Sequence, residues 1–87
     1  MEINKISKAG TLESNDIYVV LSPSEEKGIT INLESIVIKQ FGDEIEKAIK
    51  ETLQKFDVQN VVVTAQDKGA LDYTIRARVE TAIKRAQ

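Results

Sequence analysis

The side chains that could do chemistry in this sequence are carboxylates, lysines, arginines and hydroxyls, because its 87 residues include neither cysteine nor histidine. Ser–His and Cys–His nucleophile pairs are therefore excluded, as are the thiolate and imidazole ligands that most transition-metal sites use. Asp43, Glu44 and Glu46 lie close together, but we interpret them as residues of a helix's first turn that complement its dipole, not as an acid/base pair. We expect no catalytic residues, no metal site and no independent enzyme activity.

Among the hydroxyls, Ser14 has the most distinctive surroundings. In the stretch AGTLESNDIYVV, Ser14, Asn15 and Asp16 separate two β-prone runs at residues 9–13 and 17–21. Asparagine and aspartate favour tight turns, so we expect Ser14 at the exposed tip of a β-hairpin, where another enzyme could modify it. Serine is also a common turn residue without any further role, and the residue types alone favour that simpler interpretation.

Lys68, Arg76 and Arg78 form a basic cluster near the C-terminal end of the chain. These cations could contact phosphate groups or an acidic patch on a partner protein. However, Arg76 follows Asp72 by four residues and precedes Glu80 by four, which is the spacing of ordinary ion pairs on a helix surface. We favour the ion pairs over a phosphate contact.

The strands that would position Ser14 are indicated by alternation of apolar and polar residues. Residues 29–34 alternate in this way. In 17–21 the residues Ile17, Val19 and Leu21 form a plainly apolar face, and the opposite face is partly apolar; a polar loop at 22–28 separates the two runs. The run at 58–65 is too apolar for an exposed edge, so it predicts a strand inside the sheet.

Two amphipathic helices are indicated where apolar residues recur at steps of three and four. The first is expected to begin at Ser35, as its N-cap, or nearer Gly42, and to end at Asp57. Asp67 is the expected cap of the second. The apolar stripes contain Ile38, Phe41, Ile45, Ala48, Ile49, Leu53 and Phe56 in the first helix, and Leu71, Ile75, Val79, Ala82, Ile83 and Ala86 in the second.

These elements predict a single α+β domain over residues 1–87, in the order β-β-β-α-β-α. Two layers, a mixed sheet of about four strands with both helices packed on one face, would bury every apolar face at once. The first two strands should form an antiparallel hairpin, and the strand-helix-strand unit at 29–65 could form a parallel crossover. A domain of this size has a marginal core, so partner subunits are expected to add stability.

The composition is that of an ordinary soluble globular domain, with 41% hydrophobic residues, 30% charged residues and a formal net charge of −2. We expect no nucleic-acid partner, because binding nucleic acid needs a clustered positive surface. No run approaches the roughly 20 apolar residues that span a bilayer, and the N-terminus has no apolar core of signal-peptide length. We therefore expect a cytoplasmic protein with no membrane partner.

Three segments carry a resemblance to a known family, namely AGTLESND at 9–16, KQFGDEI at 39–45 and DKGALDYTIRARVE at 67–80. In order and spacing they resemble the acyl carrier protein (gamma) subunit of citrate lyase, over nearly the whole chain. That family often has glycine where this chain has Asn15, and cysteine where it has Tyr73. Neither departure removes the hydroxyl, and asparagine adopts the left-handed turn conformation nearly as readily as glycine.

The resemblance implies a non-catalytic acyl carrier subunit of a complex that cleaves citrate to acetate and oxaloacetate. It implies that Ser14 carries, through a phosphodiester, a covalent 2'-(5''-phosphoribosyl)-3'-dephospho-CoA group whose thiol holds acetyl and citryl thioesters. The implied partners are the citrate lyase alpha subunit (acyl transferase), the beta subunit (citryl lyase), a prosthetic-group transferase and an acetylating ligase. Lys68, Arg76 and Arg78 are then candidates for contacts with the arm or with a partner.

Ser35 is the competing attachment site. In the segment LESI it superficially resembles the Asp-Ser-Leu motif that lies at a helix N-terminus in fatty-acid and polyketide carriers. Those carriers are all-helical bundles, whereas three β-like runs precede Ser35, and an N-cap role already accounts for this serine. The alternative function that remains open is a non-catalytic assembly module in which every serine is unmodified.

Overall fold

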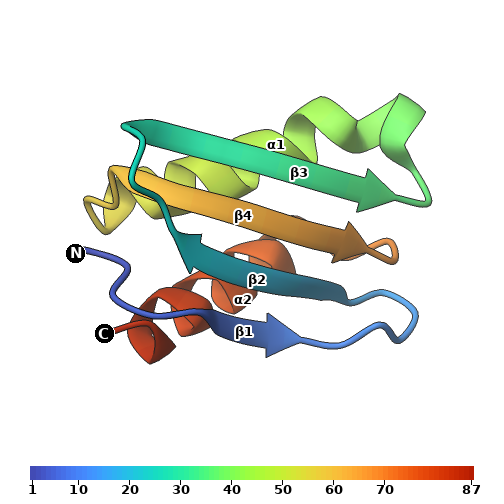
Figure 1. The fold of residues 1–87 in the computed structure, drawn as a ribbon. Helices are drawn as coiled ribbons and strands as arrows, with labels where there is room; N and C mark the ends of the chain where they lie inside the picture. The colour runs from blue at the N-terminus through green and yellow to red at the C-terminus, as the bar shows by residue number, and fades with distance from the viewer.

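The chain alternates strands and helices in the predicted order, β-β-β-α-β-α (Figure 1). The computed structural model describes all residues from 1 to 87. The elements are β1 (Ser7–Gly10), β2 (Ile17–Pro23), β3 (Gly28–Ser35), α1 (Ile38–Lys55), β4 (Asn60–Asp67) and α2 (Asp72–Arg85). The expected α+β class is confirmed.

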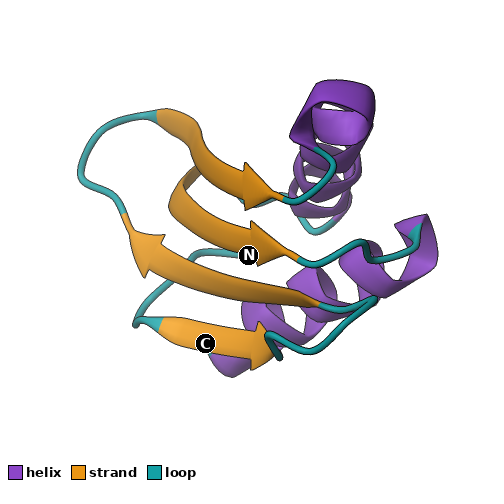
Figure 2. Cartoon of the chain, turned by 90° about the vertical axis from the view of Figure 1, so that its right-hand side faces the viewer, coloured by secondary structure: helices purple, strands orange, loops and turns teal.

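The four strands form one mixed sheet in the order β1-β2-β4-β3. The hairpin of β1 and β2 is antiparallel, as predicted, and β4 lies inside the sheet, antiparallel to β2 and parallel to β3. Val63 of β4 therefore pairs with Leu21 on one side and with Ile31 on the other. The connection at residues 24–27 carries the chain past the end of β4, so β2 and β3 flank that strand and do not pair with each other (Figure 2).

Both helices pack on one face of the sheet, which gives the two predicted layers (Figure 2). Alternate residues of β2 and β4 point into the space between the layers and are almost completely buried, which is the pattern expected of strands with one face on the core. The buried hydrophobic residues are Ile3, Ala9, Ile17, Val19, Leu21, Ile45, Ala48, Ile49, Leu53, Val58, Val61, Val63, Ala65, Ile75, Val79, Ala82, Ile83 and Ala86. Neither helix combines the length and the apolar character needed to cross a bilayer.

The helix starts differ from the prediction. Helix α1 begins at Ile38, after Val37 in the N-cap position, and neither Ser35 nor Gly42 marks its start. Its first turn contains no acidic residue, so the prediction that Asp43, Glu44 and Glu46 complement the helix dipole there is wrong. Three residues of the predicted apolar stripes, Ile38, Phe41 and Leu71, are exposed at the beginnings of the helices rather than buried.

Three connections meet at one end of the sheet, on the right in Figure 1 and toward the viewer in Figure 2. They are the β1–β2 loop (residues 11–16), the β3–α1 link (residues 36–37) and the β4–α2 loop (residues 68–71). They share this end because β3 and β4 run parallel to each other and antiparallel to β2. Ser14 lies in the first of them.

Candidate functional site around Ser14

Ser14 is exposed in the bend of the β1–β2 loop, and its hydroxyl makes no hydrogen bond within the chain. The next residue, Asn15, has a φ of 65°, the left-handed conformation that the sequence allowed for. The turn closes where the Asp16 N–H donates to the Glu13 carbonyl oxygen at 3.2 Å. The predicted exposure of Ser14 at a hairpin tip is confirmed, although β1 ends at Gly10 and makes the loop longer than expected.

The loop is anchored by the carboxylate of Asp16, which is only 8% exposed. This carboxylate accepts hydrogen bonds from Thr11 Oγ1 at 2.7 Å and from the Ile17 N–H at 2.8 Å. Arg78 of α2 also donates to it, through Nε at 3.0 Å and Nη2 at 3.2 Å. Burial tends to raise the pKa of Asp16, but the hydrogen bonds from Arg78, Thr11 and Ile17 and the charge of Arg78 outweigh it and lower the pKa to about 2. At neutral pH Asp16 is therefore an anion, and it ties the loop to α2.

The same loop is also joined to the β4–α2 loop by backbone hydrogen bonds. The Asn15 N–H donates to the Lys68 carbonyl oxygen at 2.8 Å, and the Lys68 N–H donates to the Asp16 carbonyl oxygen at 2.9 Å. These bonds extend the antiparallel pairing of β2 and β4 beyond Ile17 and Asp67. Ser14 is thus exposed at the surface, while the residue after it is fixed to the central part of the sheet.

Asp67 holds the neighbouring connections together from the end of β4. Its side chain is buried and accepts hydrogen bonds from Ser35 Oγ at 2.8 Å, the Gly69 N–H at 3.1 Å and the Ala70 N–H at 2.9 Å. The prediction that Asp67 caps the last helix is wrong, since the N-cap position of α2 is Leu71 and has no side-chain cap. Asp67 instead satisfies the amides of the turn that leads to α2, as an aspartate at the start of a tight turn commonly does.

Ser35 has a structural role that differs from the predicted one. Besides donating to Asp67, its half-buried hydroxyl accepts a hydrogen bond from the Val37 N–H at 3.1 Å. It therefore bridges the end of β3 to β4 and is not the N-cap of α1. A covalent group on this oxygen would replace the proton that Ser35 donates to Asp67 and would remove that hydrogen bond, which argues against Ser35 as the attachment site.

Arg76 forms surface ion pairs, but only one of the two pairs that the sequence spacing predicted is present. Its guanidinium contacts Asp72 at 2.7 Å, as predicted, and also Glu51 of α1 at 2.9 Å. The pair predicted with Glu80 does not form, because that carboxylate contacts Lys84 at 2.8 Å. Arg76 thus links the two helices, which leaves it poorly placed for a phosphate.

The other two members of the basic cluster lie closer to Ser14. Arg78 is paired with Asp16, and its side chain remains 41% exposed beside the loop. Lys68 makes no ion pair, although its backbone is bonded to residues on the C-terminal side of Ser14. Of the three predicted contact residues, Lys68 is therefore the one whose side chain makes no ion pair and whose backbone bonds to the residues after Ser14.

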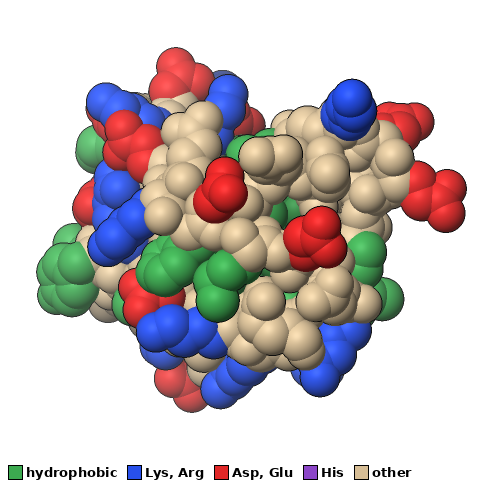
Figure 3. Space-filling view, turned by 90° about the vertical axis from the view of Figure 1, so that its left-hand side faces the viewer, with side chains coloured by type: hydrophobic (Ala, Val, Ile, Leu, Met, Phe, Trp, Pro, Cys, Tyr) green, Lys and Arg blue, Asp and Glu red, His purple; other side chains and the backbone are tan.

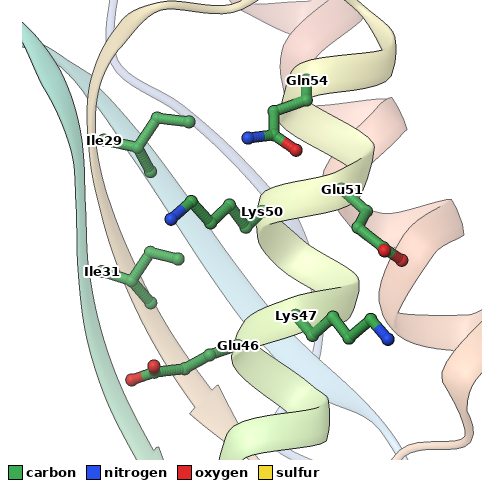
Figure 4. A pocket seen from close by; sticks show the side chains of 7 residues that line it. All are labelled: Ile29, Ile31, Glu46, Lys47, Lys50, Glu51 and Gln54. Carbon is green, nitrogen blue, oxygen red and sulfur yellow. The ribbon is translucent and has the colours of Figure 1, made fainter.

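The largest hollow of the molecule lies away from this loop, between α1 and β3 (Figure 4). It has a volume of about 550 Å³ and is lined by Ile29, Ile31, Glu46, Lys47, Lys50, Glu51 and Gln54. Figure 4 shows Lys50 reaching toward β3, whereas Lys47 and Glu51 point the other way. The charged and polar lining side chains are exposed, so this hollow lacks the buried, convergent ionisable groups of an active-site pocket.

The opposite end of the molecule carries charges of both signs. Figure 3 views that end and shows Lys and Arg side chains interspersed with Asp and Glu side chains, without a broad field of either sign. No group of three or more Asp and Glu residues is close enough to hold a metal ion.

The sequence interpretation missed the residues that hold the Ser14 loop in place. Asp16 was assigned only a turn role, and its pairing with Arg78, 62 residues away, has no local signature. For Asp67, the segment DKG directly after a strand is typical of a tight turn and could have indicated the observed hydrogen bonds.

The fold and the loop define a small two-layer α+β domain in which the exposed Ser14 lies on an anchored loop. A family model described as "Malonate decarboxylase delta subunit (MdcD)" matches residues 4–86. Curated relatives named citrate lyase acyl carrier protein match nearly the whole chain. The relative from Halothermothrix orenii is 51% identical over 99% of this chain and 90% of its own length. The relative from Streptococcus mutans is 54% identical over 99% of this chain and 84% of its own length. The chain belongs to the citrate lyase acyl carrier protein family.

Solved structures support the same fold. A chain of a Pseudomonas malonate decarboxylase hetero-tetramer in complex with malonate superposes with a TM-score of 0.80 at 16% identity, over 98% of this chain and 87% of that one. A Thermus thermophilus protein matches with a TM-score of 0.68 at 15% identity, but over only 17% of its own length. The predicted resemblance is confirmed, and the naming of the relatives as carrier proteins agrees with the expectation of a carrier that does no catalysis itself.

Proposed function

We propose that this chain is the acyl carrier subunit of a citrate lyase complex and that Ser14 is the attachment site of its prosthetic group. The observation that carries the proposal is the free, exposed hydroxyl of Ser14 on a loop whose base is fixed by Asp16 and Lys68. The names of relatives about half identical over nearly the whole chain support the carrier role. The group we propose is 2'-(5''-phosphoribosyl)-3'-dephospho-CoA.

The residues around Ser14 fit such a group. A phosphodiester on the serine oxygen would break no hydrogen bond in the chain, and solvent already surrounds the loop. Lys68 supplies a nearby cation without an ion-pair partner, which favours a phosphate over a neutral substituent. A serine hydroxyl is a weak nucleophile, so an external transferase would have to activate it, since no base in the chain contacts it.

The chain's own task would be to hold and present the arm. When bound, the group supplies a thiol for acyl thioester chemistry, which explains how a chain without cysteine can carry acyl groups. The alpha (acyl transferase) and beta (citryl lyase) subunits would each act on the same tethered arm. A short flexible tether gives an effective concentration on the order of millimolar, so the acyl group can meet both sites without being lost to solvent.

The proposal is tested by co-expressing the chain with its lyase partners, the prosthetic-group transferase and the acetylating ligase. Intact mass and peptide mapping are then measured for the wild type and for Ser14→Ala. We expect one added mass equal to that of the prosthetic group, on the peptide that contains Ser14, and none in the variant.

Two further serines serve as controls. Ser24→Ala removes a half-buried loop hydroxyl that bonds only to the backbone of Glu26, and it should leave the added mass unchanged. Ser35→Ala should also keep the added mass, although it loses stability because Asp67 loses a hydrogen bond. A phosphopantetheine-sized addition on Ser35 would mean that another class of carrier is present. A fully matured complex with no addition on any serine would favour the non-covalent assembly module.

A further inference from the structure

An apolar groove opens between the beginnings of the two helices, at the same end of the molecule as Ser14. It has a volume of about 340 Å³, and most of its lining is hydrophobic, consisting of Val37, Phe41, Ile45, Ala70, Leu71 and Ile75. Gly69 and the carboxylates Glu44 and Asp72 complete the wall. Its volume is near the lower end of the roughly 300–1,000 Å³ typical of small-molecule sites.

The groove differs from the other hollows in leaving apolar side chains in water. Phe41 is 53% exposed and Leu71 is 56% exposed, although the helical pattern predicted both inside the core. The other hollows have mainly polar or charged linings. A groove with a mostly apolar lining suits an uncharged ligand group.

The groove is continuous with the loop that carries Ser14. Asn15 follows Ser14 and bonds to the backbone of Lys68, and Gly69, the next residue, lines the groove. A methyl group built on Gly69 would lie 3.8 Å from Asn15 Oδ1. A chain attached to Ser14 therefore has to pass only the loop edge to enter the groove.

The charges around the groove favour binding of an uncharged part of the arm over its phosphates. No lysine or arginine lines it, and the carboxylates Glu44 and Asp72 at its wall would repel phosphates. Lys68, by contrast, lies between Ser14 and the groove along the loop. Along the loop, Lys68, which could attract a phosphate, therefore comes before the apolar lining of the groove.

We infer that this groove holds the uncharged pantetheine and acyl thioester end of the arm that Ser14 carries, between visits to partner subunits. The inference rests on the proposed function, because it needs a covalent arm on Ser14. The interaction can be weak and still matter. At a millimolar effective concentration, a dissociation constant on the order of 1 mM leaves the arm bound about half of the time.

The test is methyl NMR of the full chain, with and without the group on Ser14, after intact mass has established the modification. We expect the methyl signals of Ile45, Leu71 and Ile75 to shift on modification. The methyls of Val20 and Val62, which alternate with the core-facing residues and belong to the opposite sheet face, should stay unchanged. Free pantetheine added at millimolar concentration to the unmodified chain should move the same groove signals.

A matched pair of variants checks the site. Phe41→Glu adds a charge to the groove wall at an exposed helix position and should abolish most of the groove shifts. Tyr73→Glu adds the same charge on α2 at a side chain that is 72% exposed and outside the groove, and should preserve them. Circular dichroism checks that both variants fold.

The outcomes separate this inference from the proposed function. If Ser14 never gains mass, the proposed function fails and the groove inference falls with it. If the mass is present but the shifts are confined to residues 11–16, the carrier role stands and the inference is overturned. If the groove signals move only when a partner subunit is added, the groove is a protein-docking site, which also overturns the inference.

Discussion

At the scale of single residues, Asp16 matters most for the Ser14 loop, because it converts an exposed turn into a fixed one. Its carboxylate has a folded-state pKa of about 2, below the ordinary value of 3.8. A lowered pKa contributes stability that is fully present above the unfolded value and is lost as the pH falls from about 4 toward 2. The partner Arg78 is 41% exposed, so solvent screening reduces the contribution to roughly 1 to 2 kcal/mol.

We therefore expect Asp16→Asn to lower the free energy of unfolding by roughly 1 to 2 kcal/mol at pH 7 and to make much less difference at pH 2. Urea unfolding of the wild type and the variant at both pH values measures this. Asp43→Asn, which changes an exposed carboxylate without a partner, is the control and should change little at either pH. A gap between wild type and Asp16→Asn that persists undiminished at pH 2 would contradict the ion-pair argument.

At the scale of elements, the end of β1 depends on a glycine. Gly10 has a φ of +89°, and a Cβ there would lie 1.8 Å from the Ile17 carbonyl oxygen. The backbone of β2 would have to move, so Gly10→Ala should cost about 3 kcal/mol or more. Gly28→Ala is the matched control, because its φ is +107° with no atom within 4 Å, and it should cost only roughly 1 to 2 kcal/mol.

Thermal and urea unfolding of the two alanine variants gives the comparison. Equal losses at the two positions would show that the backbone conformation, and not the contact with Ile17, determines the cost. A greater loss at Gly10 supports the close approach of the two strands at the base of the Ser14 loop.

The side chain of Asp67, at the end of β4, bonds to β3 and to the β4–α2 loop, so removing it should lower the free energy of unfolding. Asp67→Ala leaves the Ser35 hydroxyl and the amides of Gly69 and Ala70 without their acceptor, which should cost about 2 to 4 kcal/mol. Asp72→Ala removes an exposed ion pair and a favourable charge in the first turn of α2, and should cost about 1 kcal/mol. Chemical unfolding distinguishes them, and a small loss for Asp67→Ala would mean that water replaces its hydrogen bonds.

Comparison with the sequence shows which of these features local patterns can predict. The alternation in 17–21 and 29–34 predicted two strands and the face that each buries, because period-2 patterning is a local property. The predicted helix starts were wrong. The N-cap positions are Val37 and Leu71, which make no side-chain cap, whereas the expected caps Ser35 and Asp67 bond to each other across β3 and β4.

The candidate site divides in the same way. The exposure of Ser14 was predicted from turn chemistry, and the left-handed conformation of Asn15 is one that asparagine readily adopts. The Asp16–Arg78 pair and the groove beside Leu71 arise only when segments far apart in the chain meet, so no short pattern indicated them.

At the scale of the whole molecule, we expect the free energy of local opening to be highest in β4 and lower in the edge strand β1. This strand is hydrogen-bonded on both sides, whereas β1 is a four-residue edge strand bonded only to β2. In amide hydrogen exchange, each 1.4 kcal/mol of opening free energy slows the rate about tenfold. We expect the β4 amides to exchange slowest, at the rate set by global unfolding, and the β1 amides at least about tenfold faster.

The Ser14 loop provides the sharpest contrast in that experiment. The Asn15 and Lys68 amides donate backbone hydrogen bonds across the two loops, whereas the Ser14 amide donates none. Asn15 should therefore be protected by about 100-fold or more relative to Ser14, one residue away, because its exchange requires the end of the β2–β4 pairing to open. Equal, rapid exchange at both residues would mean that the whole loop is loose, and a carrier arm would then start from a flexible tip. Protection at Asn15 with fast exchange at Ser14 would instead give an accessible hydroxyl on a firm base, which lets a modifying enzyme reach the oxygen without unfolding any part of the sheet.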